Sequence, residues 1–196
     1  MLSDEEKRYL FRLIRGALSF YFEGKSFSPS PPTPQEKYPH LFEKRGAFVT
    51  LWKGNSLRGC IGNIYPTRPL YEEICEIALS SALRDPRFPP LQKEELPEIE
   101  LEISLLSPLI KGSIEDLEVG KHGILIQKGY YRGLLLPQVA TEYNWDAETF
   151  LRHACLKAGL PEDCYLYPET EIYLFTAEVF REREIPPCGK EKSMTP

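Results

Sequence analysis

Apolar residues near the start of the chain recur at intervals of three and four positions, the spacing of one face of an α-helix. The positions concerned are Leu10, Leu13, Ile14, Ala17 and Leu18. Ser3 and Glu6 precede them at the spacing of a capping box, and Gly24 follows them as a stop signal. This pattern predicts a helix over residues 3–23, followed by a proline-rich loop over residues 25–39.

The next segments have the composition of a hairpin, a helix and a strand. Residues 47–53 and 57–64 are rich in β-branched and aromatic residues and flank a short Gly-Asn turn. A helical pattern follows over residues 69–85. Residues 98–105 then alternate strictly between acidic and apolar side chains, which predicts a strand with one buried face.

The same order of elements occurs a second time. Residues 123–128 and 131–136 form the second predicted hairpin, residues 146–158 a helix, and residues 172–177 a strand. We therefore predict an α+β fold in which antiparallel sheets are flanked by helices, built from a duplicated unit. Residues 185–196 are expected to form a mobile tail after a single domain that spans residues 1–184.

Composition limits the classes of function. The chain has 196 residues, enough for one domain or for one domain of two similar halves, and 42% of them are hydrophobic. Lys and Arg number 24 and Asp and Glu number 29, so the net charge is 24 − 29 = −5. An acidic balance argues against a protein whose main role is to coat nucleic acid, so we expect no nucleic-acid partner.

Location and cofactors follow from what the chain lacks. It has no apolar run of about eighteen residues, so we expect no membrane span, and its charged N-terminus is unlike a secretory signal. Both features favour a cytoplasmic protein. The five cysteines are scattered without a CxxC pair, so we expect neither a disulfide framework nor a metal site, and no cofactor is implied.

The segment over residues 57–62 is the first candidate site. On a strand, Arg58, Cys60 and Gly62 share one face, and Gly59 on the other face allows close approach of a helix or strand. Arg58 lies about 7 Å from Cys60 by strand rise, and a nearby guanidinium favours the thiolate. Gly62 is expected to leave open volume, so these residues predict a nucleophile or an anion pocket.

A packing role for the same cysteine is the alternative. Free cysteine often serves as a small buried hydrophobe. If the Gly54–Asn55 turn has two residues, Val49 lies opposite Cys60, and an apolar neighbour would leave the thiol inert.

The loop over residues 84–90 is the second candidate site. Its three prolines stiffen a backbone that presents Arg84, Asp85, Arg87 and Phe88. Arginine and phenylalanine on a stiff loop can bind an anionic or planar ligand. The alternative is that an Arg–Asp pair only fixes the end of the preceding helix.

Two histidines are candidates for the base that a nucleophilic Cys60 would need. His122 precedes a predicted strand, and His153 lies on the late predicted helix. Either residue is more often structural than catalytic, so both interpretations stay open.

The sequence resembles the AMMECR-type domain family. The match covers about residues 46–180 and consists of three blocks in the same order, together with His122–Gly123: residues 57–62, 82–90 and 133–161. The resemblance implies a duplicated unit with exchanged C-terminal strands, two unequal lobes, and a groove between them near residues 57–62. In microbes such a domain is sometimes fused to, or encoded beside, a Memo-type domain and a radical-SAM enzyme, so the resemblance implies these as candidate partners but no particular reaction.

Two hypotheses of function result. The first is a binding or scaffold module that works with a partner enzyme, for which the radical-SAM and Memo types are the candidates. The second is an enzyme with Cys60 as nucleophile or redox thiol, acting on a small anionic substrate that Arg58 and Arg87 would bind.

Overall fold

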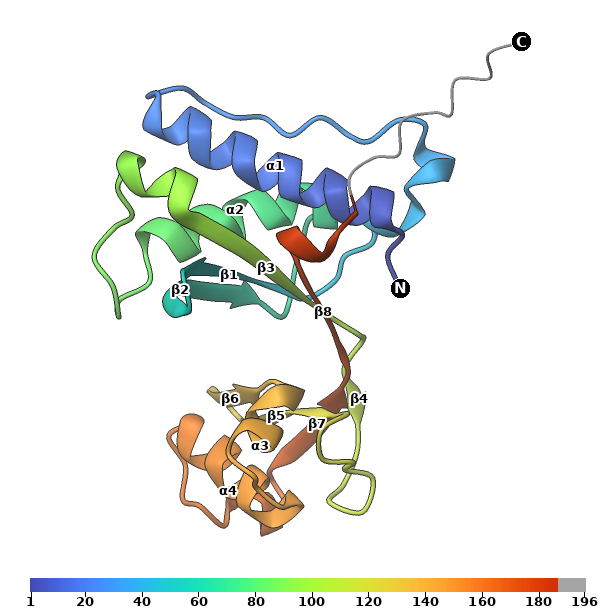
Figure 1. The fold of residues 1–196 in the computed structure, drawn as a ribbon. Coiled ribbons are helices and arrows are strands. Elements are labelled where there is room, and N and C mark those ends of the chain that lie inside the picture. Colours follow the sequence, from blue (N-terminus) through green and yellow to red (C-terminus); the bar gives the residue numbers. More distant parts are fainter. Residues whose placement is uncertain (187–196) are drawn as a thin grey trace. The chain divides into compact units, whose positions relative to one another are not determined.

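The structure is a computed structural model that describes residues 1–186, and it consists of two compact units (Figure 1). Unit 1 comprises Met1–Leu105 together with the described residues from Glu178 onward, and unit 2 comprises Leu106–Ala177. Each unit contains one four-stranded sheet.

The sheet of unit 1 has the strand order β2-β1-β3-β8. Its strands are β1 (Ala47–Lys53), β2 (Ser56–Asn63), β3 (Ile99–Leu106) and β8 (Ala177–Arg181). Strand β1 pairs antiparallel with both β2 and β3. The predicted hairpin and the predicted alternating strand are therefore neighbours in one sheet, with β2 at one edge.

Two long helices cover one face of this sheet (Figure 1). They are α1 (Asp4–Phe22) and α2 (Leu70–Leu83). Their fully buried residues join those of β1 and β3 in one core: Leu10, Ile14, Leu18, Leu70, Ile74, Val49, Leu51, Leu101 and Ile103. The apolar positions that predicted these elements are therefore the positions that the unit buries.

The start and the end of α1 are those that the sequence indicates. The Ser3 hydroxyl accepts from the Glu6 backbone N–H at 3.3 Å, and the Glu6 carboxylate accepts from the Ser3 N–H at 2.9 Å. This capping box satisfies two N–H groups that the helix itself leaves unpaired. Gly24 follows the helix with φ of +69°, a conformation that favours glycine.

The sheet of unit 2 has the strand order β4-β7-β5-β6. Its strands are β4 (Ile110–Lys111), β5 (Gly123–Lys128), β6 (Tyr131–Leu135) and β7 (Glu171–Phe175). Neighbouring strands are antiparallel.

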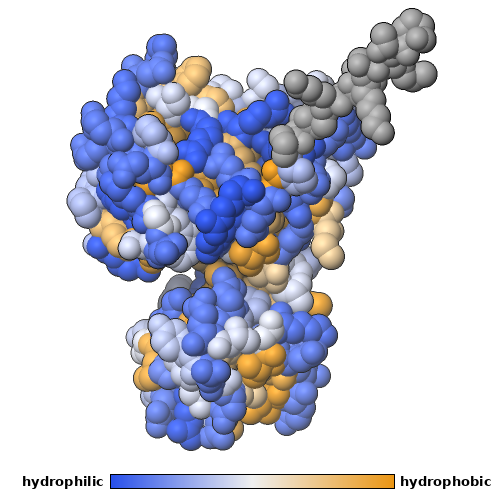
Figure 2. Space-filling model, viewed as in Figure 1, coloured by the Kyte–Doolittle hydropathy of each residue, from blue (hydrophilic) through white to orange (hydrophobic). Residues whose placement is uncertain are grey.

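Two helices complete unit 2. They are α3 (Pro137–Glu142), which the sequence pattern did not reveal, and α4 (Ala147–Lys157), whose N-cap Asp146 accepts from the Thr149 backbone N–H. A separate core gathers between α4 and the sheet around Ile124, Ile126, Phe150, Leu151 and Ala154. On the visible face of each unit, hydrophilic residues dominate and hydrophobic ones form small groups (Figure 2).

Short 3₁₀ helices occupy several connections. Their bounds are η1 (Gln35–Lys37), η2 (Pro39–Phe42), η3 (Lys93–Glu98), η4 (Cys164–Leu166) and η5 (Glu182–Glu184).

The two sheets exchange their last strands. Strand β4 follows β3 in the chain but pairs with β7, and β8 follows β7 but lies beside β3. Read from the hairpin outward, the orders β2-β1-β3-β8 and β6-β5-β7-β4 are the same. The two crossings run side by side, since the Ser107 N–H donates to the Thr176 carbonyl at 2.9 Å. The predicted fold class is confirmed, including the exchange, while descent by duplication stays a prediction.

Three expectations about the chain need correction. Residues 172–177 do not form one strand, because β7 ends at Phe175 and β8 begins at Ala177. The tail does not begin at residue 185, since Ile185 packs against the core and the Arg8 guanidinium donates to the Pro186 carbonyl at 2.8 Å. The rest of the predicted tail lies outside the described residues.

The third correction concerns the cysteines. Cys155 on α4 and Cys164 in η4 form a disulfide, with Cα atoms 5.8 Å apart. Their spacing of nine residues showed no pattern, but the chain turns back after α4 and places both side chains in the core of unit 2. The sequence predicted no disulfide framework, and this single bridge was therefore missed.

Candidate functional site

Residues 57–62 form most of the edge strand β2, and their register contains a bulge. Thr50 of β1 lies opposite Cys60, and the pairing shifts by one position at Leu51/Trp52, so that Arg58 has no opposite partner. The expected pairing of Val49 with Cys60 is therefore wrong. A bulge adds one residue to one strand, which moves every later pair by one position and by one face.

Gly59 allows helix α2 to approach the strand. A Cβ atom at Gly59 would collide with the backbone carbonyl oxygen of Ser81. The Ser81 hydroxyl in turn accepts from the Ile61 backbone N–H at 2.9 Å. The predicted close approach at Gly59 is confirmed, and Ser81 is a buried contact that the sequence pattern did not indicate.

Gly62 does not leave open volume. The ring of Phe48, directly opposite on β1, fills the space where a side chain at Gly62 would lie. The expected hollow beside the thiol is therefore absent at this position, because the neighbouring strand contributes an aromatic ring.

Arg58 is held by Glu95 and does not contact the thiol. Its Nε and Nη2 donate to the two Glu95 carboxylate oxygens at 3.0 and 2.9 Å, and its Nη1 donates to the Pro89 carbonyl at 2.9 Å. The bonds from Arg58 lower the pKa of Glu95 to about 2, against the effect of burial. The prediction that Arg58 promotes a thiolate at Cys60 is not supported by this geometry.

Asp85 fixes both the strand edge and the loop over residues 84–90. Its buried carboxylate accepts from the Cys60 backbone N–H at 2.9 Å and from the Arg87 Nε and Nη2 at 2.9 and 2.7 Å. Arg87 Nη2 also donates to the Cys60 carbonyl at 3.1 Å. Asp85 and Arg87 thus form hydrogen bonds with the N–H and the carbonyl of Cys60, the groups that another strand would otherwise bond at this sheet edge.

The charge on Asp85 is strongly favoured. The hydrogen bonds from Arg87 are the largest cause of a pKa well below the usual range, and they outweigh the effect of burial. Arg87 remains the exposed partner, with 55% of its side chain accessible, and its guanidinium lies 5.5 Å from the ring centroid of Phe88.

The Cys60 thiol is half-buried and accepts a hydrogen bond from the Thr50 hydroxyl at 3.3 Å. Burial raises the pKa of this thiol, and the Thr50 bond and the charge of Arg87 offset the effect only in part. The thiol is therefore protonated at neutral pH, whereas a nucleophilic cysteine needs the thiolate.

A polar row crosses the sheet from this thiol. Thr50 lies opposite Glu102 of β3, and the Glu102 carboxylate accepts from Arg181 Nε of β8 at 2.7 Å. The sequence pattern did not identify Thr50 or Arg181 as neighbours of Cys60. The alternation of residues 98–105 did place Glu102 on the face away from the core.

The two candidate bases, His122 and His153, lie in unit 2 and form contacts with residues of that unit. His122 Nδ1 accepts from the Glu118 backbone N–H at 3.1 Å, which leaves the ring proton on Nε2. The ring of His153 stacks on Trp145 with centroids 3.8 Å apart and planes 3° apart. No described hydrogen bond joins either histidine to Cys60.

Two larger features are lacking in the described part of the chain. No group of three His, Cys, Asp or Glu side chains within residues 1–186 is arranged to hold a metal ion. Over the same residues, no helix combines the length and apolar character needed to cross a membrane.

The comparisons with known proteins agree on one family. The family model AMMECR1 matches residues 11–180. Protein TK0174 of Thermococcus kodakarensis is 47% identical over 193 residues, covering 92% of each chain. Protein MK0488 of Methanopyrus kandleri is also 47% identical, covering 93% of this chain and 91% of its own. The crystal structure of the uncharacterized protein PH0010 from Pyrococcus horikoshii is 46% identical, covers 92% of this chain and 93% of its own, and has a TM-score of 0.81.

Proposed function

The chain belongs to the AMMECR1 family, and from that premise we propose that it is a binding module which serves a partner protein. The observation that carries the proposal is the Asp85–Arg87 pair bonded to the backbone of Cys60. This contact joins residues 57–62 to the loop over residues 84–90, so that the two blocks form one rigid surface.

The loop presents the features of a protein-recognition surface. Arg84, Pro86, Arg87, Pro89 and Pro90 are exposed, and Phe88 is half-buried beneath Arg87. Prolines and the bonds from Asp85 fix the loop before binding, which reduces the entropy lost on association. Arginine and aromatic side chains supply much of the binding energy at interfaces. Because Arg84 is exposed and pairs with no carboxylate among the described residues, we expect it to bind an acidic segment of the partner.

The same geometry disfavours catalysis at Cys60. Arg58 pairs with Glu95 and Arg87 pairs with Asp85, so both guanidinium groups that were expected to bind an anionic substrate are already neutralised. Burial raises the pKa of the Cys60 thiol. The surroundings of Cys60 therefore supply neither a thiolate nor a free guanidinium group for an anionic substrate.

The partner classes follow from the resemblance. Memo-type and radical-SAM proteins from the same organism are the first candidates for the partner. We also propose that the protein acts in the cytoplasm. The groove expected between the lobes also stays a prediction.

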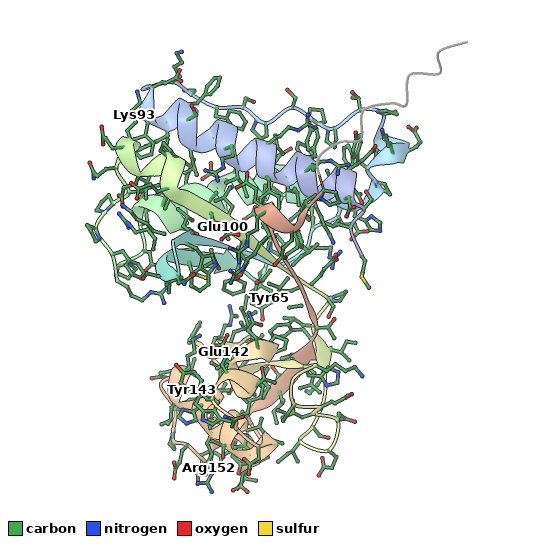
Figure 3. All side chains as sticks on the ribbon, in the orientation of Figure 1. Tyr65, Lys93, Glu100, Glu142, Tyr143 and Arg152 are labelled. Atoms are coloured by element: carbon green, nitrogen blue, oxygen red, sulfur yellow. A yellow bond between two sulfur atoms is a disulfide. The ribbon has the colours of Figure 1, made fainter. Side chains whose placement is uncertain are left out.

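Binding measured with purified candidates tests the proposal. Arg84→Ala and Phe88→Ala should each weaken binding about tenfold or more, since truncating a hot-spot residue at the centre of an interface costs about 2 kcal/mol or more and about 1.4 kcal/mol is a factor of ten. Arg152→Ala is the matched control, because Arg152 is an exposed arginine that projects from α4 in unit 2 (Figure 3). Equal affinity of all three variants and of the unaltered protein would remove the loop from the proposal.

A second candidate function is an enzyme that uses Cys60, favoured by the partial exposure of the thiol and its bond from Thr50. Alkylation followed against pH separates the two. For a binding module, Cys60 labels slowly at pH 7 and faster as the pH rises. The buried Cys75, whose pKa is raised to about 12, is the internal reference. Rapid labelling of Cys60 at pH 6 would favour the enzyme.

A further inference from the structure

Three arginines follow one another along one face of α1. Arg8, Arg12 and Arg15 are separated by four and three residues, so their side chains lie on the same side of the helix. The whole chain has a net charge of −5, so this stripe is a local excess of positive charge. Arg15 pairs with Glu182 of η5 at 2.6 Å, which places η5 beside α1.

The stripe lines a hollow of about 620 Å³ in unit 1. Phe11, Tyr38, Ile185 and Pro186 give the hollow an apolar lining, and Lys37 adds a fourth cation. Pockets of about 300 to 1,000 Å³ with a mainly apolar lining and a few fixed polar groups are typical of small-molecule sites.

Hydrogen bonds fix the walls of this hollow. Arg15 Nη2 donates to the Glu182 carboxylate and to the Ile99 carbonyl, both at 2.6 Å. Arg8 Nη1 donates to the Pro186 carbonyl at 2.8 Å. The segment over residues 182–186 is thus tied to α1 at both ends, and the hollow exists before any ligand binds.

The charges around the hollow do not balance. Glu182 pairs with Arg15, and Glu5 pairs with Lys37 at 2.8 Å. Arg12 is exposed, with its guanidinium carbon 5.2 Å from the ring centroid of Tyr9. Within residues 1–186 no carboxylate forms an ion pair with Arg8 or Arg12. Two guanidinium charges therefore face the hollow without an acidic partner among the described residues.

We propose that this hollow binds a phosphate monoester that carries an apolar or aromatic group. Guanidinium groups match phosphate oxygens with paired hydrogen bonds, and two unneutralised charges suit a dianion. Phe11, Tyr38 and Pro186 would contact the apolar group of the ligand. Neither Cys60 nor the loop over residues 84–90 lines this site, so it is separate from the proposed binding surface for a partner.

Phenyl phosphate is the probe for this site, with titration calorimetry on the full chain and amide chemical shifts to locate it. We expect saturable binding that moves the resonances of α1 and of residues 37–38. Arg12→Gln should weaken binding about tenfold or more, because it removes a charge-assisted hydrogen bond to the phosphate. Arg12 is exposed, so this variant keeps the fold, and Arg152→Gln on α4 is the control that should keep full affinity.

Two further ligands separate the parts of the proposal. Inorganic phosphate should bind more weakly than phenyl phosphate, and phenol should not bind detectably. Equal affinity for phenyl phosphate and inorganic phosphate would overturn the role of the apolar lining. Unchanged affinity in Arg12→Gln, or no saturable binding at millimolar phenyl phosphate, would overturn the site itself.

Discussion

Asp85 stabilises the edge of β2 through its hydrogen bonds with the Cys60 backbone and with Arg87. Asp85→Asn keeps the size of the side chain but removes the negative charge that Arg87 and the Cys60 N–H bind. We expect a loss of about 2 kcal/mol in the free energy of unfolding, the usual worth of a hydrogen bond to a charged group, since half of Arg87 is exposed to solvent. Urea denaturation measures it. Glu36→Gln, at an exposed position in η1, should change stability by less than about 0.5 kcal/mol.

The same carboxylate gives a dependence on pH. Its pKa is lower in the folded protein than in the unfolded chain, where an aspartate titrates near about 3.9. The unfolded chain therefore takes up the proton first, and the stabilisation is complete above about pH 5 and is lost as the pH falls below about 4. The stability difference between the unaltered protein and Asp85→Asn should shrink over this range. A constant difference from pH 7 to pH 3 would contradict the assignment.

Gly59 gives a prediction about packing. Gly59→Ala places a methyl group against the Ser81 carbonyl, a backbone atom that cannot move aside without moving α2. Overpacking of this kind costs about 1 to 3 kcal/mol, and thermal unfolding should show a lower midpoint. Ser56→Ala, exposed on the same strand, should leave the midpoint unchanged. An equal midpoint for both variants would show that β2 and α2 are more loosely packed than described.

At the scale of the elements, the disulfide between α4 and η4 closes a short loop in unit 2. Closing about ten residues stabilises a fold by about 3 kcal/mol through the entropy of the unfolded chain. A Cys155→Ala/Cys164→Ala double variant should therefore unfold at a lower temperature, with the change confined to unit 2 in hydrogen exchange. Cys60→Ala, which removes no cross-link, is the control. No change in the double variant would mean that the bond adds nothing to unit 2.

The elements also show what sequence patterns can reach. Long periodic segments such as α1 and β3 were predicted nearly to the residue, because burial on one face forces their spacing. Strand β4 has only two residues, both exposed, so no alternation exists to detect. The bulge at Arg58 depends on the partner strand, and the Arg58–Glu95 pair joins residues 37 positions apart, so neither is visible locally. The sequence indicated residues 57–62 and 84–90 as candidates and offered an Arg–Asp pair within the loop as an alternative, but it did not indicate the pairing of Arg58 with Glu95.

At the scale of the whole molecule, the strand exchange means that the two units differ in their ability to fold alone. Residues 106–177 contain β4, β5, β6 and β7 and a core of their own, whereas residues 1–105 lack β8. We expect residues 106–177 to fold alone, and residues 1–105 to aggregate through the uncovered edge of β3. Circular dichroism and size-exclusion chromatography of the two fragments measure this. A soluble, folded 1–105 fragment would show that β8 is dispensable.

The paired crossings at Ser107 and Thr176 have a consequence for engineering. The chain leaves β3 and re-enters β8 at adjacent points, so unit 2 has the topology of a domain inserted into a hairpin. Excision of residues 107–176 and closure with an Asn-Gly turn would leave β3 and β8 as an ordinary two-stranded hairpin beside β1. Unit 1 would then be a minimal scaffold that retains residues 57–62, the loop over residues 84–90 and the arginine-lined hollow. These three features could be studied in the absence of unit 2.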